Sequence, residues 1–155
     1  MTYRIHGVAS EPFDELRGLD DAALAARNAR RMIVDKPGAF PCRVTLEDVE
    51  PGEKVLLLNH VSHEVDGPFR ASHAIFVREA PCAPAVHRDQ TPIYLERRTL
   101  GLRGFDAEGM MRSASLAMPG EADTRIRALL EDPEIVTIHA HNAARGCFLA
   151  RIERD

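Results

Sequence analysis

Residues 135–148 read IVTIHAHNAARGCF, and this stretch decides the fold of the C-terminal part of the chain. It begins with a β-branched apolar run that contains His139 and His141. Because successive side chains of a strand point to opposite faces, the two histidines share one face. The polar segment that follows is typical of a turn, and a second apolar run starts after Cys147. We predict a β-hairpin over residues 135–153 that carries two histidines on one face.

The register of this hairpin decides which face carries Cys147. Cross-strand neighbours lie on the same face, and a shift of one residue exchanges the faces. Matching apolar positions 136, 138 and 140 with 148, 150 and 152 requires a connection of three or five residues, to which Gly146 is suited. We favour this register, which places Cys147 beside the histidines. A loop of two or four residues would bury the thiol on the other face.

The rest of the chain predicts more strands than helices. Apolar and β-branched runs predict strands near residues 3–8, 41–46, 54–60, 72–78, 98–106 and 110–118. Alanine, leucine and arginine after an aspartate cap predict a helix near 20–34, and apolar spacing of three and four predicts another near 120–132. Strands that follow one another without alternating helices indicate an α+β fold. We expect a single domain over residues 1–155, with a mainly antiparallel sheet and two principal helices.

Composition excludes several classes of function. The net charge is −4 and there is no Trp, so the chain lacks the basic surface and the aromatic platforms of nucleic-acid-binding proteins. The longest apolar run, Val55–Leu58, is far shorter than the roughly 20 residues that span a bilayer. The first residues do not resemble a secretory signal, and three widely spaced cysteines indicate reduced thiols. We expect a cytoplasmic protein that binds neither nucleic acid nor membrane.

A metal centre is the first hypothesis for the site. His139 and His141 would be two ligands, and His60 at the end of its predicted strand would be the third. The alternatives for the third ligand are Cys147, His63 and His73. Nitrogen and sulfur donors favour zinc, with iron or copper less suited. The structural alternative is that the histidines bond to backbone carbonyls or line an outer face of the sheet.

A cysteine nucleophile is the second hypothesis. Cys147 or Cys42 would be activated by a histidine, and Asn142 would orient the imidazole ring. Free cysteines more often lie inert in the core.

An anion pocket is the third hypothesis, because guanidinium groups match carboxylates and phosphates. The candidates are Arg43 and Arg103, from a larger set that also includes Arg70, Arg78, Arg97 and Arg98. Surface pairing with the 24 acidic residues is the alternative for most of these arginines.

These groups favour a small enzyme that acts on a small molecule, with His139, His141, Cys147 and Asn142 as catalytic candidates. The alternative is a non-catalytic module that binds a small molecule or a protein. An enzyme would hold these groups in a concave pocket with perturbed protonation, whereas a module would show them exposed or individually hydrogen-bonded.

Several motifs, in order along nearly the whole chain, resemble a bacterial family of domains of unknown function, number 1203. The most specific are Pro41-Cys42-Arg43 and His139-x-His141-Asn142-Ala143-x-x-Gly146-Cys147. The others are Leu56–His60, Ala74–Arg78 and Arg103-x-Phe105-Asp106. The resemblance implies a single-domain bacterial protein, and it implies no reaction and no catalytic residue.

Overall fold

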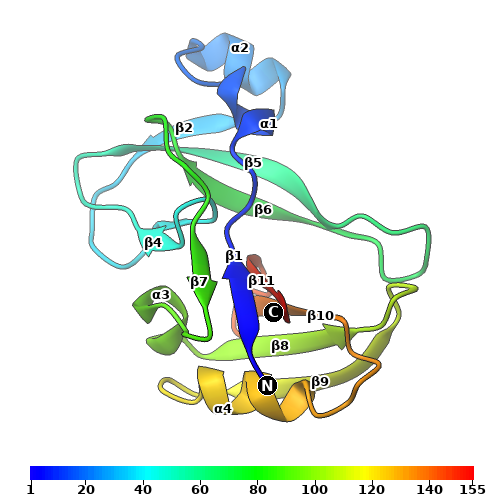
Figure 1. The fold of residues 1–155 in the computed structure, drawn as a ribbon. Coiled ribbons are helices and arrows are strands. Elements are labelled where there is room, and N and C mark those ends of the chain that lie inside the picture. The colour runs from blue at the N-terminus through cyan, green and yellow to red at the C-terminus, as the bar shows by residue number, and fades with distance from the viewer.

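The strands form two sheets, which lie one above the other in the view of Figure 1. The computed structural model describes residues 1–155. The lower sheet has six antiparallel strands, in the spatial order β7 (Val86–Arg88), β1 (Tyr3–His6), β11 (Phe148–Arg154), β10 (Thr137–Asn142), β8 (Leu100–Phe105) and β9 (Met111–Ala117). The upper sheet has five strands, in the order β2 (Arg30–Ile33), β5 (Lys54–His63), β6 (Ala71–Arg78), β3 (Pro41–Cys42) and β4 (Glu47–Asp48). The one parallel pair is β3 with β6, so mainly antiparallel pairing is confirmed.

The four helices are short, and only one matches a predicted helix along most of its length. They are α1 (Glu11–Asp14), α2 (Asp21–Ala26), α3 (Ile93–Glu96) and α4 (Ala122–Leu129). The α+β class is confirmed, and α4 lies within the predicted range 120–132. None of the helices combines the length and the apolar character needed to cross a bilayer.

The helix predicted over residues 20–34 was wrong beyond Ala26. Asn28 has a positive φ of 56°, which ends the helical path, and the chain continues as strand β2. Residues 30–33 then pair with β5 along the edge of the upper sheet. Backbone pairing in the sheet therefore overrides the helix propensity of the arginines and Met32.

The strand limits also differ from those predicted. Strand β5 continues to His63, beyond the predicted limit at residue 60, so His60 lies inside the strand. Strand β7 lies in a stretch for which no strand was predicted. The run 41–46 forms only the two-residue strand β3 before the chain turns into β4.

Each sheet has its own apolar cluster. In the lower sheet, Ile138 and Ala140 of β10 pack with Ile126 of α4 and Tyr94 of α3. In the upper sheet, Leu56 and Leu58 of β5, Ile75 and Val77 of β6 and neighbouring residues pack with Phe13 and Leu24 from the N-terminal segment. Helix α4 therefore covers the face of the lower sheet that points away from the upper sheet (Figure 1).

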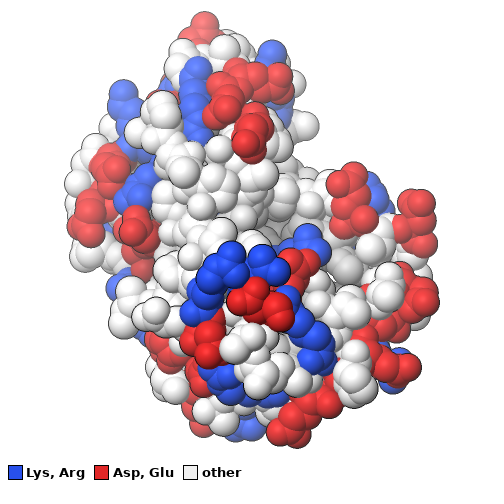
Figure 2. Space-filling view, in the orientation of Figure 1, with Lys and Arg blue, Asp and Glu red and all other residues white.

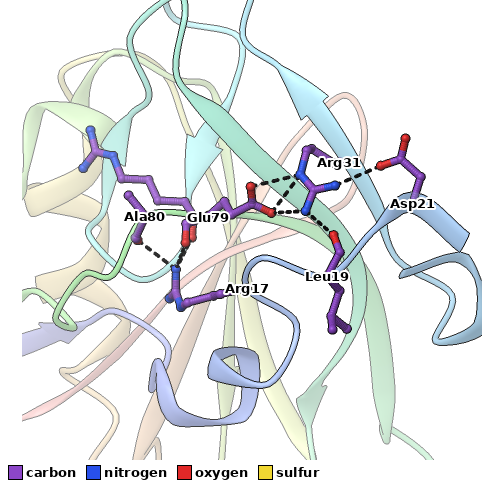
Figure 3. A network of polar contacts seen from close by, with 7 residues as sticks. Arg17, Leu19, Asp21, Arg31, Glu79 and Ala80 are labelled. Carbon is purple, nitrogen blue, oxygen red and sulfur yellow. Dashed lines mark hydrogen bonds and ion pairs between the residues drawn. The ribbon is translucent and has the colours of Figure 1, made fainter. Parts of the chain in front are cut away.

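A polar network fixes the N-terminal segment to the upper sheet (Figure 3). Arg17 donates from Nη1 to the carbonyl oxygens of residues 78, 79 and 80, at 2.7, 2.5 and 2.8 Å. Arg31 of β2 pairs with Glu79 at 2.7 Å and with Asp21 of α2 at 2.9 Å. These contacts hold α2 and β2 against the end of β6, far along the chain.

Candidate functional site

The inner face of β5 changes from leucine to histidine along its length. Leu58 pairs with Ile75 inside the apolar cluster, and the next inward pair is His60 with His73 of β6. A bulge near residue 62 then restores His63 to the same face, opposite Ala71. Strands β5 and β6 therefore bury apolar side chains at one end and present three histidines at the other.

The lower sheet presents a second histidine face toward these strands. Strand alternation places Ile138 and Ala140 in the apolar cluster, so His139 and His141 point the other way. Arg103 and Phe105 on β8 share this inner face, because Arg103 is the ladder partner of His139. The predicted pairing of the two histidines on one face of a C-terminal hairpin is confirmed.

The two faces meet in a group that we call the histidine cluster: His60, His63, His73, His139 and His141. The ring centroids of His63 and His139 are 5.0 Å apart, and those of His73 and His141 are 4.9 Å apart. Each of these pairs joins one sheet to the other.

Three aromatic contacts fill the space around these pairs. Phe105 stacks on His63 with centroids 4.1 Å apart, and Phe148 lies 5.3 Å from His139. The Phe148 ring also contacts His60, with ring centroids 6.3 Å apart.

Hydrogen bonds fix two of the imidazole tautomers. His141 Nδ1 lies 2.9 Å from the carbonyl oxygen of Gly146, and His63 Nε2 lies 2.9 Å from that of Gly109. Because a carbonyl oxygen only accepts, both of these nitrogens carry the proton. The second nitrogen of each ring, His141 Nε2 and His63 Nδ1, is then a hydrogen-bond acceptor.

Neither ring nitrogen of His139 is hydrogen-bonded within the protein, in contrast to His63, His73 and His141. The exposed fraction of His139 is only 3%, close to the 2% of His141. The fully enclosed side-chain nitrogens without partners belong to Arg4, His6 and Arg78, so the nitrogens of His139 reach open space inside the site.

Burial lowers the pKa values of four histidines of the cluster, His60, His73, His139 and His141. Burial first, and then His63, His141 and the arginines nearby, lower the pKa of His139 to about 3. Burial likewise lowers the pKa of His141 to about 4, with Arg103 and His73 contributing and the Gly146 carbonyl opposing. The pKa values of His60 and His73 are also lowered, mainly by burial.

Two cavities lie between the sheets at this cluster. The larger has a volume of about 600 Å³ and the smaller about 220 Å³. Both are lined by Ser62, His63, Phe105 and His139, so these residues form a shared wall. In Figure 2 the surface is hollowed at the right between the upper and lower sheets, and the atoms there belong mostly to uncharged residues.

The predicted metal ligands are not brought together as a metal centre. No group of three or more His, Cys, Asp or Glu side chains has an arrangement that could hold an ion. The predicted third ligand, His60, and the first, His139, both contact the ring of Phe148. The hydrogen bonds of His63 and His141 to carbonyls instead match the structural alternative for those two rings.

The structure does not pair Cys147 with a histidine. Positions 138 and 140 share a face with positions 150 and 152, as predicted, through the pairs Ile138–Ile152 and Ala140–Ala150. The prediction that Phe148 lies on this face was wrong, because the register shifts between Ala140 and His141. Leu149 is the extra residue of a bulge, and Phe148 rather than Cys147 becomes the partner of His141. The Cys147 thiol instead accepts a hydrogen bond from Arg43 Nη2 at 3.3 Å.

Cys42 and Asn142 also have structural contacts in place of the predicted catalytic ones. Cys42 is buried in the upper cluster, and its sulfur accepts the backbone N–H of Arg78 at 3.3 Å. The side-chain oxygen of Asn142 accepts the backbone N–H groups of Ala144 and Arg145, both at 3.0 Å. Asn142 therefore stabilises the hairpin turn rather than an imidazole ring.

The two predicted anion-binding arginines have different environments. Arg43 is 2% exposed and donates to the carbonyl oxygens of Phe148 and Pro41, both at 2.8 Å, so its guanidinium is already occupied. Arg103 is half-buried at the smaller cavity and makes no hydrogen bond or ion pair with the protein. Only Arg103 remains in the candidate site.

Phe105 and Phe148 were not predicted as site residues, and His63 and His73 were predicted only as alternative ligands. No regular spacing marks the histidines of β5 and β6, because His60 and His63 are three residues apart across a bulge and β6 carries His73 alone.

Fold and site together define an α+β protein of two mostly antiparallel sheets with a histidine cluster between them. The chain belongs to the family described as Protein of unknown function (DUF1203), whose model matches residues 39–154. The matched segment includes the whole histidine cluster and Arg103. No curated protein and no solved structure matches the chain.

Proposed function

We propose that the protein is a small enzyme that acts on a small molecule bound between the sheets, with His139 exchanging a proton with the substrate. One observation carries this proposal. His139 is almost fully buried, its ring nitrogens have no protein partner, and it forms part of the wall between two cavities. Buried imidazoles are normally hydrogen-bonded, and the exceptions are concentrated at functional sites.

The cavity has dimensions suited to a small molecule. Ligand pockets usually have volumes of about 300–1,000 Å³ and combine apolar walls with few polar groups. The larger cavity, at about 600 Å³, has Phe105 and Phe148 in its wall beside His139. A substrate lying on these rings would present its reacting atom to the imidazole.

The neutral imidazole of His139 supplies a lone pair for proton transfer. It would remove a proton from a substrate O–H or N–H group and later return that proton to the product. In the empty cavity its pKa of about 3 makes it a weak base. A negative charge bound nearby would raise the pKa toward the range in which general bases are effective.

A binding protein without catalysis is the second candidate, and the same low pKa values favour it. His139 and His141 are unprotonated far below neutral pH, so both serve readily as fixed hydrogen-bonding groups. For either candidate we propose a bacterial cytoplasmic setting, since all three cysteines are free thiols.

Incubation with a bacterial metabolite extract, followed by mass spectrometry, tests the two candidates. We expect the wild-type protein to deplete a compound and form a product, and His139→Gln to abolish this conversion. His87→Gln is the matched control, because His87 lies on β7 outside both cavity walls. A compound retained by the protein but never converted would favour the binding protein, and conversion unchanged in His139→Gln would contradict the role of His139.

A further inference from the structure

The smaller cavity has a wall with positive charge and no negative charge. Its polar lining includes four members of the histidine cluster (His63, His73, His139 and His141) together with Arg70 and Arg103, and it contains no Asp or Glu. Arg70 has only a long ion pair with Glu64, at 3.9 Å, and about half of its side chain is exposed. In a chain with 24 acidic residues and 20 Lys and Arg, a pocket without carboxylates stands out from the surface pairing elsewhere.

Arg103 is the centre of this positive charge. It lies beside His139 in the sheet ladder, and its charge acts on His73, His139 and His141. Since these imidazoles are neutral and no carboxylate is present, the guanidinium donors have no partner in the protein. An anionic oxygen is the group that such a guanidinium binds best.

The imidazoles impose a second requirement on the ligand. The Nε2 atom of His141 and the Nδ1 atom of His63 are acceptors, because the other nitrogen of each ring donates to a carbonyl oxygen. Neither acceptor belongs to the fully enclosed atoms without partners, so both reach open space at the cluster. An oxyanion without hydrogen would leave these lone pairs unsatisfied, which costs binding free energy.

We propose, building on the proposed function, that the smaller cavity binds the anionic end of the substrate and that this end carries an O–H group beside the negative oxygen. Arg103 binds the anionic oxygen, and an imidazole acceptor of the cluster receives the hydroxyl proton. Two chemistries share this pattern: a carboxylate with a hydroxyl on the adjacent carbon, and a hydrogen phosphate. The cavity volume of about 220 Å³ is below the range for whole ligands, so it holds this end while the larger cavity holds the rest.

Paired anions that differ in the hydroxyl group test this inference. The histidine ring signals would be followed by NMR at constant pH and ionic strength during titration with glycolate or acetate, and with inorganic phosphate or sulfate. We expect glycolate to bind about tenfold more tightly than acetate, and phosphate about tenfold more tightly than sulfate, the value of one hydrogen bond to a charged ligand. Whichever of glycolate and phosphate binds more tightly identifies the source of the anion.

Substitutions at Arg103 test its part. We expect Arg103→Gln to weaken the binding of phosphate and glycolate by about tenfold or more, and Arg103→Lys to lose part of the affinity because it lacks the planar fork. Arg145→Gln is the control, since Arg145 is exposed on the hairpin turn. Thermal unfolding establishes whether each variant is folded. If Arg103→Gln is not folded, the affinity of Arg103→Lys for the anions is the test of the role of Arg103.

Equal binding of all four anions, or unchanged affinity in the Arg103 variants, would overturn the inference. Its failure is distinguishable from failure of the proposed function. Anion binding without conversion of any compound would support the inference and contradict the proposal that the protein is an enzyme. Conversion of an uncharged compound that Arg103→Gln leaves unchanged would support the proposed enzyme and contradict the anionic end of its substrate.

Discussion

Among single residues, Arg43 shows how far a role expected from sequence can differ from its contacts. Its chemistry suggested an anion-binding guanidinium. The side chain instead reaches across to β11, where it donates to the Phe148 carbonyl and the Cys147 thiol. It therefore links the upper sheet to the strand that carries Phe148, on which His60 and His139 pack.

Replacing this buried guanidinium should be costly for stability. We expect Arg43→Met to lower the free energy of unfolding by roughly 2–4 kcal/mol, because two buried carbonyl oxygens lose charged donors. Chemical denaturation measures the loss, and Arg145→Met on the exposed turn is the control, with an expected change within about 0.5 kcal/mol. Equal stability of the two variants would show that Arg43 is not a structural link.

Among elements, the C-terminal hairpin marks the limit of what alternation predicts. Apolar alternation correctly placed Ile138 and Ala140 on one face with Ala150 and Ile152, but it placed Phe148 on that face as well, which was wrong. The bulge at Leu149 was not predictable, because Phe148, Leu149 and Ala150 are all apolar and period-two spacing cannot show which residue is extra. Because Leu149 is the extra residue, Phe148 and not Cys147 is the cross-strand partner of His141.

The hairpin turn gives a test of the structural role of Asn142. We expect Asn142→Ala to lower the free energy of unfolding by about 1 kcal/mol, because two backbone N–H groups lose their acceptor. Asn142→Asp keeps an acceptor oxygen and should be close to wild type. Thermal or chemical unfolding measures both, and equal losses in the two variants would contradict this role.

The segment after β1 offers a second test at this scale, because it carries the chain toward the upper sheet. Gly7 donates to the carbonyl oxygen of Ala85, and a Cβ atom at this position would lie 1.9 Å from the carbonyl oxygen of Val44. We expect Gly7→Ala to lower the free energy of unfolding by about 1–3 kcal/mol or more through this overlap. Gly67→Ala is the matched control, since nothing lies within 4 Å of its Cβ position. Equal stability of the two variants would show that the backbone yields there at little cost.

For the whole molecule, the sequence predicted the class of fold and the shared face of His139 and His141. It did not predict how the strands divide into two sheets. Local spacing indicates that a strand has two faces, and so His139 and His141 were placed together. The division into two sheets depends on pairings between distant segments, such as β1 with β11 and β2 with β5. Each sheet then presents its own histidines, and only the packing of one sheet on the other sets His63 and His73 against His139 and His141. The helix predicted at 20–34 was wrong beyond Ala26 for the same reason, because β2 gains its stability from β5.

The same arrangement makes stability depend on pH. Burial between the sheets lowers the pKa of His139 to about 3 and that of His141 to about 4, whereas in the unfolded chain both values return to about 6.5. As the pH falls below 6.5 the unfolded state binds protons that the native state does not, so the free energy of unfolding falls between pH 6.5 and 4. Each histidine contributes a slope of roughly 1.4 kcal/mol per pH unit within this window.

Urea denaturation from pH 7.5 to 4.5 measures this dependence, and comparison of variants separates the histidines from the carboxylates. His139→Asn removes one buried imidazole, so its unfolding free energy should vary less steeply with pH than that of the wild type. His87→Asn, on β7 and partly exposed, should keep the wild-type slope. A wild-type slope in His139→Asn would mean that His139 is not held neutral between the sheets, because only a group with different proton binding in the two states contributes to the slope.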